Sequence, residues 1–231
     1  MFRLKIAKPD IKCPKCNVNL SKLKTEKCPI CHDRMKTLLS NSGIPPQCSL
    51  PFSALQETPH NKELLHDMRK TLDNPALLSK NSIFLHGRTG SGKTLHACVF
   101  ATHLIRRHFI DTAFIQVSEH LNALKQLFAA QRNQGDILEL EDNSPETSQQ
   151  LLSLKKKRVL IMDDINRKYT EFELETIYNI IDYRYRNKLF TIFTAQDKHL
   201  AMLPEQTSTR IAHMCQPYYL GNTNMRNHFS E

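Results

Sequence analysis

A short apolar run followed by a glycine-rich segment constrains the fold of this chain more than any other feature. Residues 82–86 read SIFLH and residues 86–94 read HGRTGSGKT. Apolar residues then fall on one face of a helix over residues 95–109. Three of the six glycines in the chain lie in this one loop. We therefore predict a buried strand, a tight glycine turn and a helix in direct succession.

In that setting, Gly87-x-x-x-x-Gly92-Lys93-Thr94 is a P-loop. Its glycines let backbone N–H groups curl around phosphates, and the start of the following helix adds its dipole. We expect Lys93 to reach the β- and γ-phosphates of ATP, and the Thr94 hydroxyl to bind Mg²⁺. The residues predicted to bind the nucleotide and its metal are Gly87, Arg88, Thr89, Gly90, Ser91, Gly92, Lys93, Thr94 and Asp163.

An acidic pair supplies the partner motif. Residues 159–164 read VLIMDD, an apolar strand that ends in two carboxylates. Such a strand end places a carboxylate beside the bound Mg²⁺, as phosphoryl transfer requires. We assign Asp163 to the magnesium shell, through water, and Asp164 to orientation of the attacking water. The alternative is an ordinary strand end with acidic residues.

Strands and helices alternate through the rest of this region. Further strands are predicted at TAFIQ (112–116), VLIM (159–162) and FTIFT (190–194), and further helices around residues 121–128 and 174–185. This order predicts an α/β fold in which a parallel sheet has helices on both faces, giving three layers. We expect this domain to span residues 82–231, after a connector (41–81) with one helix at 64–72, and we expect residues 133–150 to form a mobile polar loop.

Four cysteines near the N-terminus have the spacing of metal ligands. Cys13 and Cys16 form one C-x-x-C pair, Cys28 and Cys31 form a second, and eleven residues separate the pairs. Two such pairs complete a tetrahedron of sulfur around Zn²⁺, which leaves no open position for water and makes the site structural. A segment this short has too little core to fold alone, so metal binding would supply the missing free energy. We predict a zinc-binding module over residues 1–40, with four unrelated free cysteines as the alternative.

Basic charge is concentrated in the same segment. Residues 1–40 contain ten Lys and Arg against three Asp and Glu, which accounts for +7 of the net charge of +9. Such a segment favours an anionic partner, either nucleic acid or an acidic protein face. Residues 3–51 contain no aromatic side chain to stack on unpaired bases, which argues against single-strand binding by this module. The chain has no apolar run of membrane-spanning length and no signal-peptide core, so we expect a cytoplasmic protein.

Four segments together resemble one group of ATPases. They are GIPPQ (43–47), HGRTGSGKT (86–94), LIMDDI (160–165) and IYNIIDYRYRNKLFTIFTAQ (177–196). The chain resembles the DnaC/DnaI/IstB group of AAA+ ATPases over about residues 41–226, most specifically in the last segment. The group comprises bacterial replicative-helicase loaders and transposition helper ATPases. The zinc module is similar in placement to the N-terminal zinc domain of DnaI-type loaders, whereas IstB-type helpers ordinarily lack one.

The resemblance also implies roles for single residues after the acidic pair. In the group, the strand after the YRYRNK helix ends in Thr-Ser-Asn, and the asparagine senses the γ-phosphate. Gln196 occupies that position here and keeps the amide on a longer arm. Asn166 replaces the glycine that usually follows the acidic pair, and asparagine tolerates the left-handed backbone that such a turn needs.

An arginine finger is the last implied feature. The segment Arg210-Ile211 matches the short segment that carries the finger in the group, and Arg226 lies where the group often has a late arginine. A finger acts on the γ-phosphate of a neighbouring subunit, so the resemblance implies side-by-side assembly with ATP at the subunit boundaries. A surface arginine without such a role is the alternative for Arg210.

The function that we favour at this stage is an ATP-dependent helicase loader. Its zinc module would dock on the replicative DNA helicase, and its AAA+ domain would bind ATP and single-stranded DNA. A transposition helper ATPase is the alternative within the group, and it would need a transposase partner. A nucleotide-gated adaptor with negligible hydrolysis is an alternative from another class. It stays open because position 196 is a glutamine and position 164 is an aspartate rather than a glutamate. ATP, Mg²⁺ and Zn²⁺ are the expected cofactors.

Overall fold

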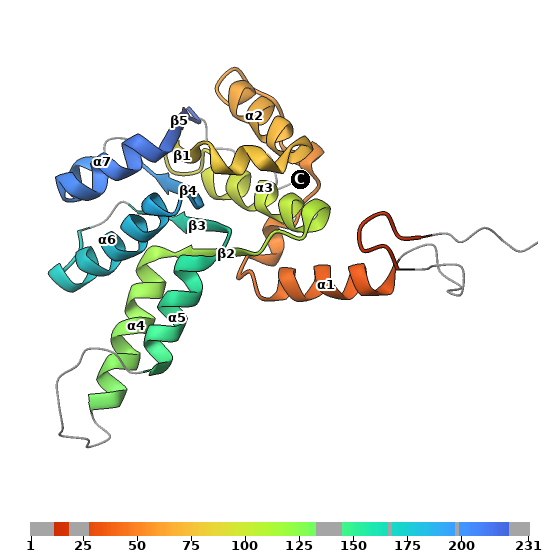
Figure 1. Cartoon of the computed structure of the whole chain (residues 1–231). Coiled ribbons are helices and arrows are strands. Elements are labelled where there is room, and N and C mark those ends of the chain that lie inside the picture. The colour runs from red at the N-terminus through yellow and green to blue at the C-terminus, as the bar shows by residue number, and fades with distance from the viewer. Residues whose placement is uncertain (1–11, 19–27, 133–144, 166–167, 197–198, 222–231) are drawn as a thin grey trace, which may run out of the picture.

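One five-stranded parallel sheet forms the centre of the chain (Figure 1). A computed structural model describes residues 12–18, 28–132, 145–165, 168–196 and 199–221. The strands are β1 (Ser82–His86), β2 (Thr112–Gln116), β3 (Val159–Asp163), β4 (Phe190–Ala195) and β5 (Cys215–Tyr219). Their spatial order is β2-β3-β4-β1-β5, and every neighbouring pair is parallel. The predicted parallel sheet and its four predicted strands are confirmed.

Helices cover both faces of this sheet. They are α1 (Pro29–Ser40), α2 (Lys62–Asp73), α3 (Lys93–His108), α4 (Val117–Arg132), α5 (Pro145–Lys156), α6 (Glu171–Arg186) and α7 (Glu205–Met214), with short 3₁₀ turns between some of them. Helices α2 and α3 pack on one face, and α4, α5, α6 and α7 pack on the other (Figure 1). The predicted three-layer arrangement, a parallel sheet with helices on both faces, is thereby confirmed. None of the described helices combines the length and the apolar character that crossing a bilayer requires.

Alternate residues of each central strand enter different cores, as the pleat of a strand requires. In β1, Ile83 and Leu85 join the core under α2 and α3, whereas Phe84 joins the core under the other helices. In β3, Ile161 faces the first core and Leu160 faces the second. Because both faces are buried, the central strands read as continuous apolar runs, which is why the sequence pattern identified them.

The predicted loop over residues 133–150 was wrong in its last part. Residues 145–150 belong to α5, while residues 133–144 lie outside the described part of the chain. The first turn of α5 is polar, and its apolar anchors come later, at Leu151 and the buried Leu154. Helix formation here depends on tertiary packing of the second half, which a polar segment of sequence does not reveal.

Strand β5 was not predicted, because CQPYY contains a proline and lacks alternation. The strand lies at the edge of the sheet, and among the described strands it pairs with β1 alone. Pro217 can occupy an edge strand, where one side of the backbone needs no ladder partner. Tyr218 packs inward, and its hydroxyl donates to Asp67 of α2 at 2.6 Å. This edge therefore connects the helices before β1 to the sheet.

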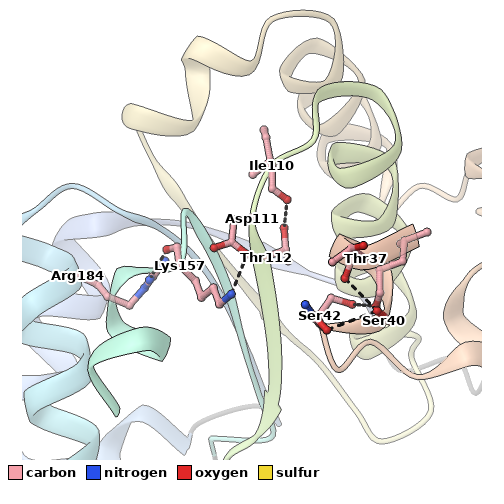
Figure 2. Close-up of polar contacts among 10 residues, drawn as sticks. Thr37, Ser40, Ser42, Ile110, Asp111, Thr112, Lys157 and Arg184 are labelled. Carbon is pink, nitrogen blue, oxygen red and sulfur yellow. Dashed lines mark hydrogen bonds and ion pairs between the residues drawn. The ribbon is translucent and has the colours of Figure 1, made fainter. Parts of the chain in front are cut away.

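The segment after α1 covers the opposite edge of the sheet. The Phe114 N–H of β2 donates to the Ser42 carbonyl at 2.7 Å. Gly43 has φ +68°, and a Cβ there would lie 3.0 Å from the Phe114 carbonyl oxygen. Close backbone approach thus explains the glycine of GIPPQ. At the start of the same strand, Lys157 Nζ pairs with Asp111 at 2.8 Å (Figure 2).

The two cysteine pairs lie against the far end of α3. Phe109 follows the last residue of this helix with φ +54°, and two cations lie near its ring. Lys15 Nζ is 4.9 Å and Arg34 Cζ is 5.4 Å from the ring centroid. Lys15 also donates to the Arg106 carbonyl at 3.0 Å, at the negative end of the helix dipole. The cysteine segment is therefore attached to the helix that begins at the P-loop.

A buried arginine holds the amino ends of β3 and β4 together. Arg184 of α6 has 0% of its surface exposed. Its guanidinium donates to the carbonyl of Lys157, just before β3, at 2.8 Å (Figure 2). It donates to the Lys155 carbonyl at 2.9 Å. It also donates to the Phe190 carbonyl at 2.6 Å and to the Thr191 hydroxyl at 2.8 Å. Burial lowers the pKa of Arg184 to about 9, and backbone oxygens rather than a carboxylate hold its charge.

Replacing Arg184 with alanine should destabilise the fold strongly, because it leaves two buried and two partly buried acceptors without their donor. We expect the free energy of unfolding to fall by roughly 3 kcal/mol or more, measured by urea denaturation. Arg186→Ala is the matched control, since that side chain is 70% exposed and pairs with Asp182 at 2.9 Å. Its loss should stay below about 1 kcal/mol. Equal losses for the two variants would contradict the role of Arg184 as a buried tie.

Candidate functional site

The P-loop connects the carboxyl end of β1 to the first turn of α3. Gly87, Gly90 and Gly92 have φ values of +145°, +86° and +84°. Gly92 is the N-cap of α3 in the left-handed conformation. A Cβ on Gly87 would lie 3.0 Å from the Gly221 carbonyl oxygen. Both positions therefore need glycine, and the strand, tight turn and helix follow one another as predicted.

The polar groups of this loop form a cradle. Lys93 is buried, and its Nζ donates to the carbonyls of Gly87 at 2.7 Å and Arg88 at 3.0 Å. The Ser91 hydroxyl is buried and has no hydrogen-bond partner in the described part of the chain. An ammonium and an unsatisfied hydroxyl at a helix N-terminus fit a phosphate group. That residues 87–94 bind a nucleotide stays a prediction.

A buried carboxylate connects three elements beside the cradle. The Thr94 hydroxyl of α3 donates to Asp163 Oδ1 at 2.8 Å, and the Thr194 hydroxyl of β4 donates to the same oxygen at 2.7 Å. Burial raises the pKa of Asp163, while the two hydroxyl donors and the Lys93 ammonium act in the opposite direction. Mg²⁺ prefers oxygen ligands of this kind, so Thr94 and Asp163 are the residues that would hold it.

Asp164 and Gln196 lie at the same carboxyl edge of the sheet. Asp164 directly follows β3, is exposed and has φ +59°, a conformation that aspartate tolerates better than most residues. Its N–H donates to the Thr194 hydroxyl at 2.9 Å. Gln196 directly follows β4, which lies between β3 and β1. The fold therefore brings both predicted residues to the edge where the P-loop begins.

Arg210 does not join this cluster within its own chain. It lies on α7, where its Nε donates to Asp182 at 2.8 Å and one terminal nitrogen donates to the Tyr178 hydroxyl at 2.9 Å, both on α6. Its guanidinium carbon is 4.8 Å from the centroid of the Tyr178 ring. A role toward a neighbouring subunit stays a prediction. Asn166 and Arg226 lie outside the described residues.

Thr194 is the site residue to which the sequence assigned no role. It holds Asp163 through its hydroxyl hydrogen and the N–H of Asp164 through its hydroxyl oxygen. Two hydroxyl residues in the apolar strand FTIFT were the available signal. Both of them serve polar contacts, because Thr191 receives a hydrogen bond from Arg184 at the other end of the strand.

The four cysteines of the two C-x-x-C pairs converge. The sulfur atoms of Cys13, Cys16, Cys28 and Cys31 all lie within 4.8 Å of one another. The Cys13–Cys31 and Cys16–Cys28 sulfur distances are 3.7 and 3.4 Å. Zn–S bonds of about 2.3 Å in a tetrahedron place the sulfurs about 3.8 Å apart. The cluster therefore matches the geometry of a closed zinc site.

A tight turn and the start of a helix bring the four cysteines together. Asn17, with φ +60°, closes the first turn, and its N–H donates to the Cys13 carbonyl at 2.9 Å. The second pair opens α1, with Cys28 as the N-cap. The N–H groups of Lys15 and Cys16 lower the pKa of Cys13 to about 6, whereas burial and the neighbouring thiols raise the pKa of Cys31 to about 12. A divalent cation would favour the thiolate form of all four, because thiolate is the ligand.

Comparison with known families decides the assignment. The NB-ARC domain family matches residues 61–216. This range includes the P-loop, strands β1 to β4 and the first two residues of β5. The chain belongs to the NB-ARC domain family. It is a P-loop nucleotide-binding protein of the AAA+ type, from a family that typically hydrolyses ATP.

Solved structures share the fold of this NB-ARC domain at low identity. The structure of the DnaC helicase loader is 18% identical, has a TM-score of 0.63 and aligns with 76% of this chain and 99% of its own. The DnaI structure is 19% identical, with a TM-score of 0.62 over 79% of this chain and 94% of its own. AMPPCP-bound DnaA from Aquifex aeolicus is 16% identical, with a TM-score of 0.56 over 76% of this chain and 51% of its own.

Relatives in sequence come from Bacillus subtilis strain 168. The phage-like element PBSX protein XkdC is 29% identical over 147 residues, which is 60% of this chain and 49% of XkdC. The uncharacterized protein YqaM is 26% identical over 147 residues, 60% of this chain and 42% of YqaM. The matched region thus spans less than half the length of either relative.

The cysteine cluster predicts a metal content. Purified protein should carry about one zinc per chain in elemental analysis, because four converging sulfurs form one closed site. Cys28→Ser should lose the zinc and the order of residues 28–40 while leaving nucleotide binding at the distant P-loop largely intact. Cys215 lies outside the cluster, so the Cys215→Ser protein is the control and should keep the full zinc content of the wild type. Wild-type protein with well under half an equivalent of metal would contradict the prediction.

Proposed function

We propose that this chain is an ATP-dependent loader of the replicative DNA helicase that acts in DNA replication. Its zinc module binds the helicase, and its AAA+ domain binds ATP and single-stranded DNA. In this proposal residues 1–40 form the zinc module, residues 41–81 the connector and residues 82–231 the ATPase domain of a cytoplasmic protein. Copies of the chain assemble side by side, with ATP at each boundary.

Each residue at the carboxyl edge has a place in this proposal. Bound Mg·ATP supplies the transferable phosphoryl group and the charge of the metal. Lys93 holds the β- and γ-phosphates, and Thr94 and Asp163 hold the metal. Asp164, exposed beside them, orients the attacking water, and Gln196 senses the γ-phosphate from the end of β4.

The observation that carries the proposal is the contact between the helix that begins at the P-loop and the segment that holds the four cysteines. Lys93 and Thr94 begin α3. At its other end, the ring of Phe109 contacts the cations of Lys15 and Arg34 in the cysteine segment. The fold resembles two structures, of a helicase loader and of DnaI, along 99% and 94% of their lengths. A basic cysteine module ahead of the ATPase domain favours the loader over a transposition helper, since helpers ordinarily lack one.

The P-loop assignment predicts the effect of removing its lysine. Lys93→Ala should weaken Mg·ATP binding at least about tenfold, because it removes the ammonium placed among the phosphate oxygens. Titration calorimetry measures the affinity directly. Lys62→Ala is the matched control, since Lys62 is also the first residue of a helix but is exposed. Unchanged affinity in the Lys93 variant would overturn the nucleotide site.

The proposed arginine finger predicts a separation of binding from turnover. Arg210→Ala should leave ATP affinity near that of the wild type and reduce hydrolysis about a hundredfold or more, because a finger acts on charge that develops during transfer. The measurement needs the assembled protein with single-stranded DNA and the helicase. In mixtures, an Arg210→Ala chain should restore activity to a Lys93→Ala chain, because one mixed boundary then has both groups.

A second variant distinguishes an arginine finger from an arginine that only stabilises the packing of α7 on α6. Asp182→Asn weakens the contact of Arg210 with α6 but keeps the guanidinium. If Arg210 only joins α7 to α6, both variants should lose the same activity. If it acts on a neighbour, only the arginine variant loses turnover. Absence of turnover in the fully assembled wild type would instead favour the nucleotide-gated adaptor.

A further inference from the structure

A buried histidine, His96, contacts the backbone of the P-loop at Gly92. His96 lies in the first turn of α3 and is 1% exposed. Its Nδ1 lies 2.8 Å from the Gly92 carbonyl oxygen. Its Nε2 lies 3.2 Å from Nδ2 of Asn61, a residue 2% exposed just before α2. Both ring nitrogens therefore have partners, on segments that are far apart in sequence.

The direction of these hydrogen bonds follows from the amide of Asn61. Its Oδ1 accepts from the Thr58 N–H at 2.7 Å, and its Nδ2 donates to the Gln56 carbonyl at 2.9 Å. The amide nitrogen is thus the atom that faces His96, and it donates to Nε2. The proton of the neutral imidazole then sits on Nδ1 and is donated to the Gly92 carbonyl. Burial lowers the pKa of His96, which favours this neutral form.

The segment that His96 contacts also reaches the other end of the P-loop. We call residues 56–61 the strap. Its His60 packs under Gly221, where a Cβ would come within 2.8 Å of the His60 ring. The Gly221 carbonyl in turn accepts from the Arg88 N–H at 3.3 Å. The strap therefore supports the phosphate loop at two places, through His96 at Gly92 and through Gly221 at Arg88.

We propose that His96 is a positioning residue for the nucleotide, which holds the strap against the P-loop and so presets the phosphate cradle. The inference rests on the proposed nucleotide site. Glycine backbone has many accessible conformations, and a bound phosphate must select one of them. A loop already fixed in that conformation loses less entropy on binding and binds more tightly. The Gly92 carbonyl also accepts from the backbone N–H of His96, so the bond to Asn61 is the one without a substitute.

Three substitutions at His96 separate the two ring nitrogens. The amide of His96→Gln reaches the place of Nε2 and can accept from Asn61, whereas the amide of His96→Asn reaches only the place of Nδ1. His96→Leu removes both bonds. We expect Mg·ATP affinity to fall roughly three- to tenfold in the Leu and Asn variants and to stay near wild type in the Gln variant. Titration with a fluorescent ATP analogue gives the affinity, and thermal unfolding shows that each variant is folded.

A double-mutant cycle keeps the test sharp if one variant folds poorly. Asn61→Leu removes the same bond from the strap side, together with its own bonds to Thr58 and Gln56, so adding His96→Leu to it should cost no further affinity. Hydrogen exchange of the strap amides should rise in the Leu and Asn variants of His96 and stay near wild type in the Gln variant, with or without nucleotide. Equal affinity in folded Leu, Asn and Gln variants would overturn the inference and leave the nucleotide site standing. Equal loss in all three would also overturn it, whereas failure of the wild type to bind ATP would overturn the site itself.

Discussion

The carboxylate of Asp163 is the contact on which the rest of the site depends. It is 8% exposed, and a charge so far from water needs partners that hold it. The hydroxyls of Thr94 and Thr194 supply them from α3 and β4. The same oxygen thus fixes the P-loop helix, the acidic strand and the strand that carries Gln196 relative to one another. A metal at this place would meet ligands that are already in position.

The two ends of the central strands bury opposite charges. At the carboxyl end, Asp163 is held by two hydroxyl groups, and at the amino end Arg184 is held by backbone carbonyls and Thr191. Neither group neutralises the other, because they lie at opposite ends of β3 and β4. In the described part of the chain the acceptors of Arg184 are backbone carbonyls and a hydroxyl, which do not ionise near neutral pH, so this contact is structural. Asp163 has donors that can exchange for a metal, which suits it to a binding site.

Helix α3 lies between the P-loop and the cysteine segment and contacts both. It has 16 residues, which corresponds to a length of about 24 Å. Its first turn carries Lys93, Thr94 and His96, and its last turn meets the cysteine segment at Arg106 and Phe109. The same helix thus contacts the P-loop at one end and the cysteine segment at the other. Through these contacts the described part of the cysteine segment has a defined position relative to the sheet.

The sequence by itself determined the P-loop, the acidic strand end, the cysteine pairs and the central strands. These features depend on local backbone and on burial on both faces, so they leave continuous patterns in the chain. Helix α5 and strand β5 left no such pattern, because packing of Leu154 and the edge position of Pro217 decided them.

Only the tertiary structure decided which polar side chains meet. Thr194 reaches Asp163 because β4 pairs with β3, and Asn61 reaches His96 because α2 and α3 share one face of the sheet. Arg210 was singled out by resemblance, yet its partners on α6 became known only from the packing of two helices. A hydrogen bond needs two groups within about 3 Å, and that distance is set by the folding of segments that are remote in sequence.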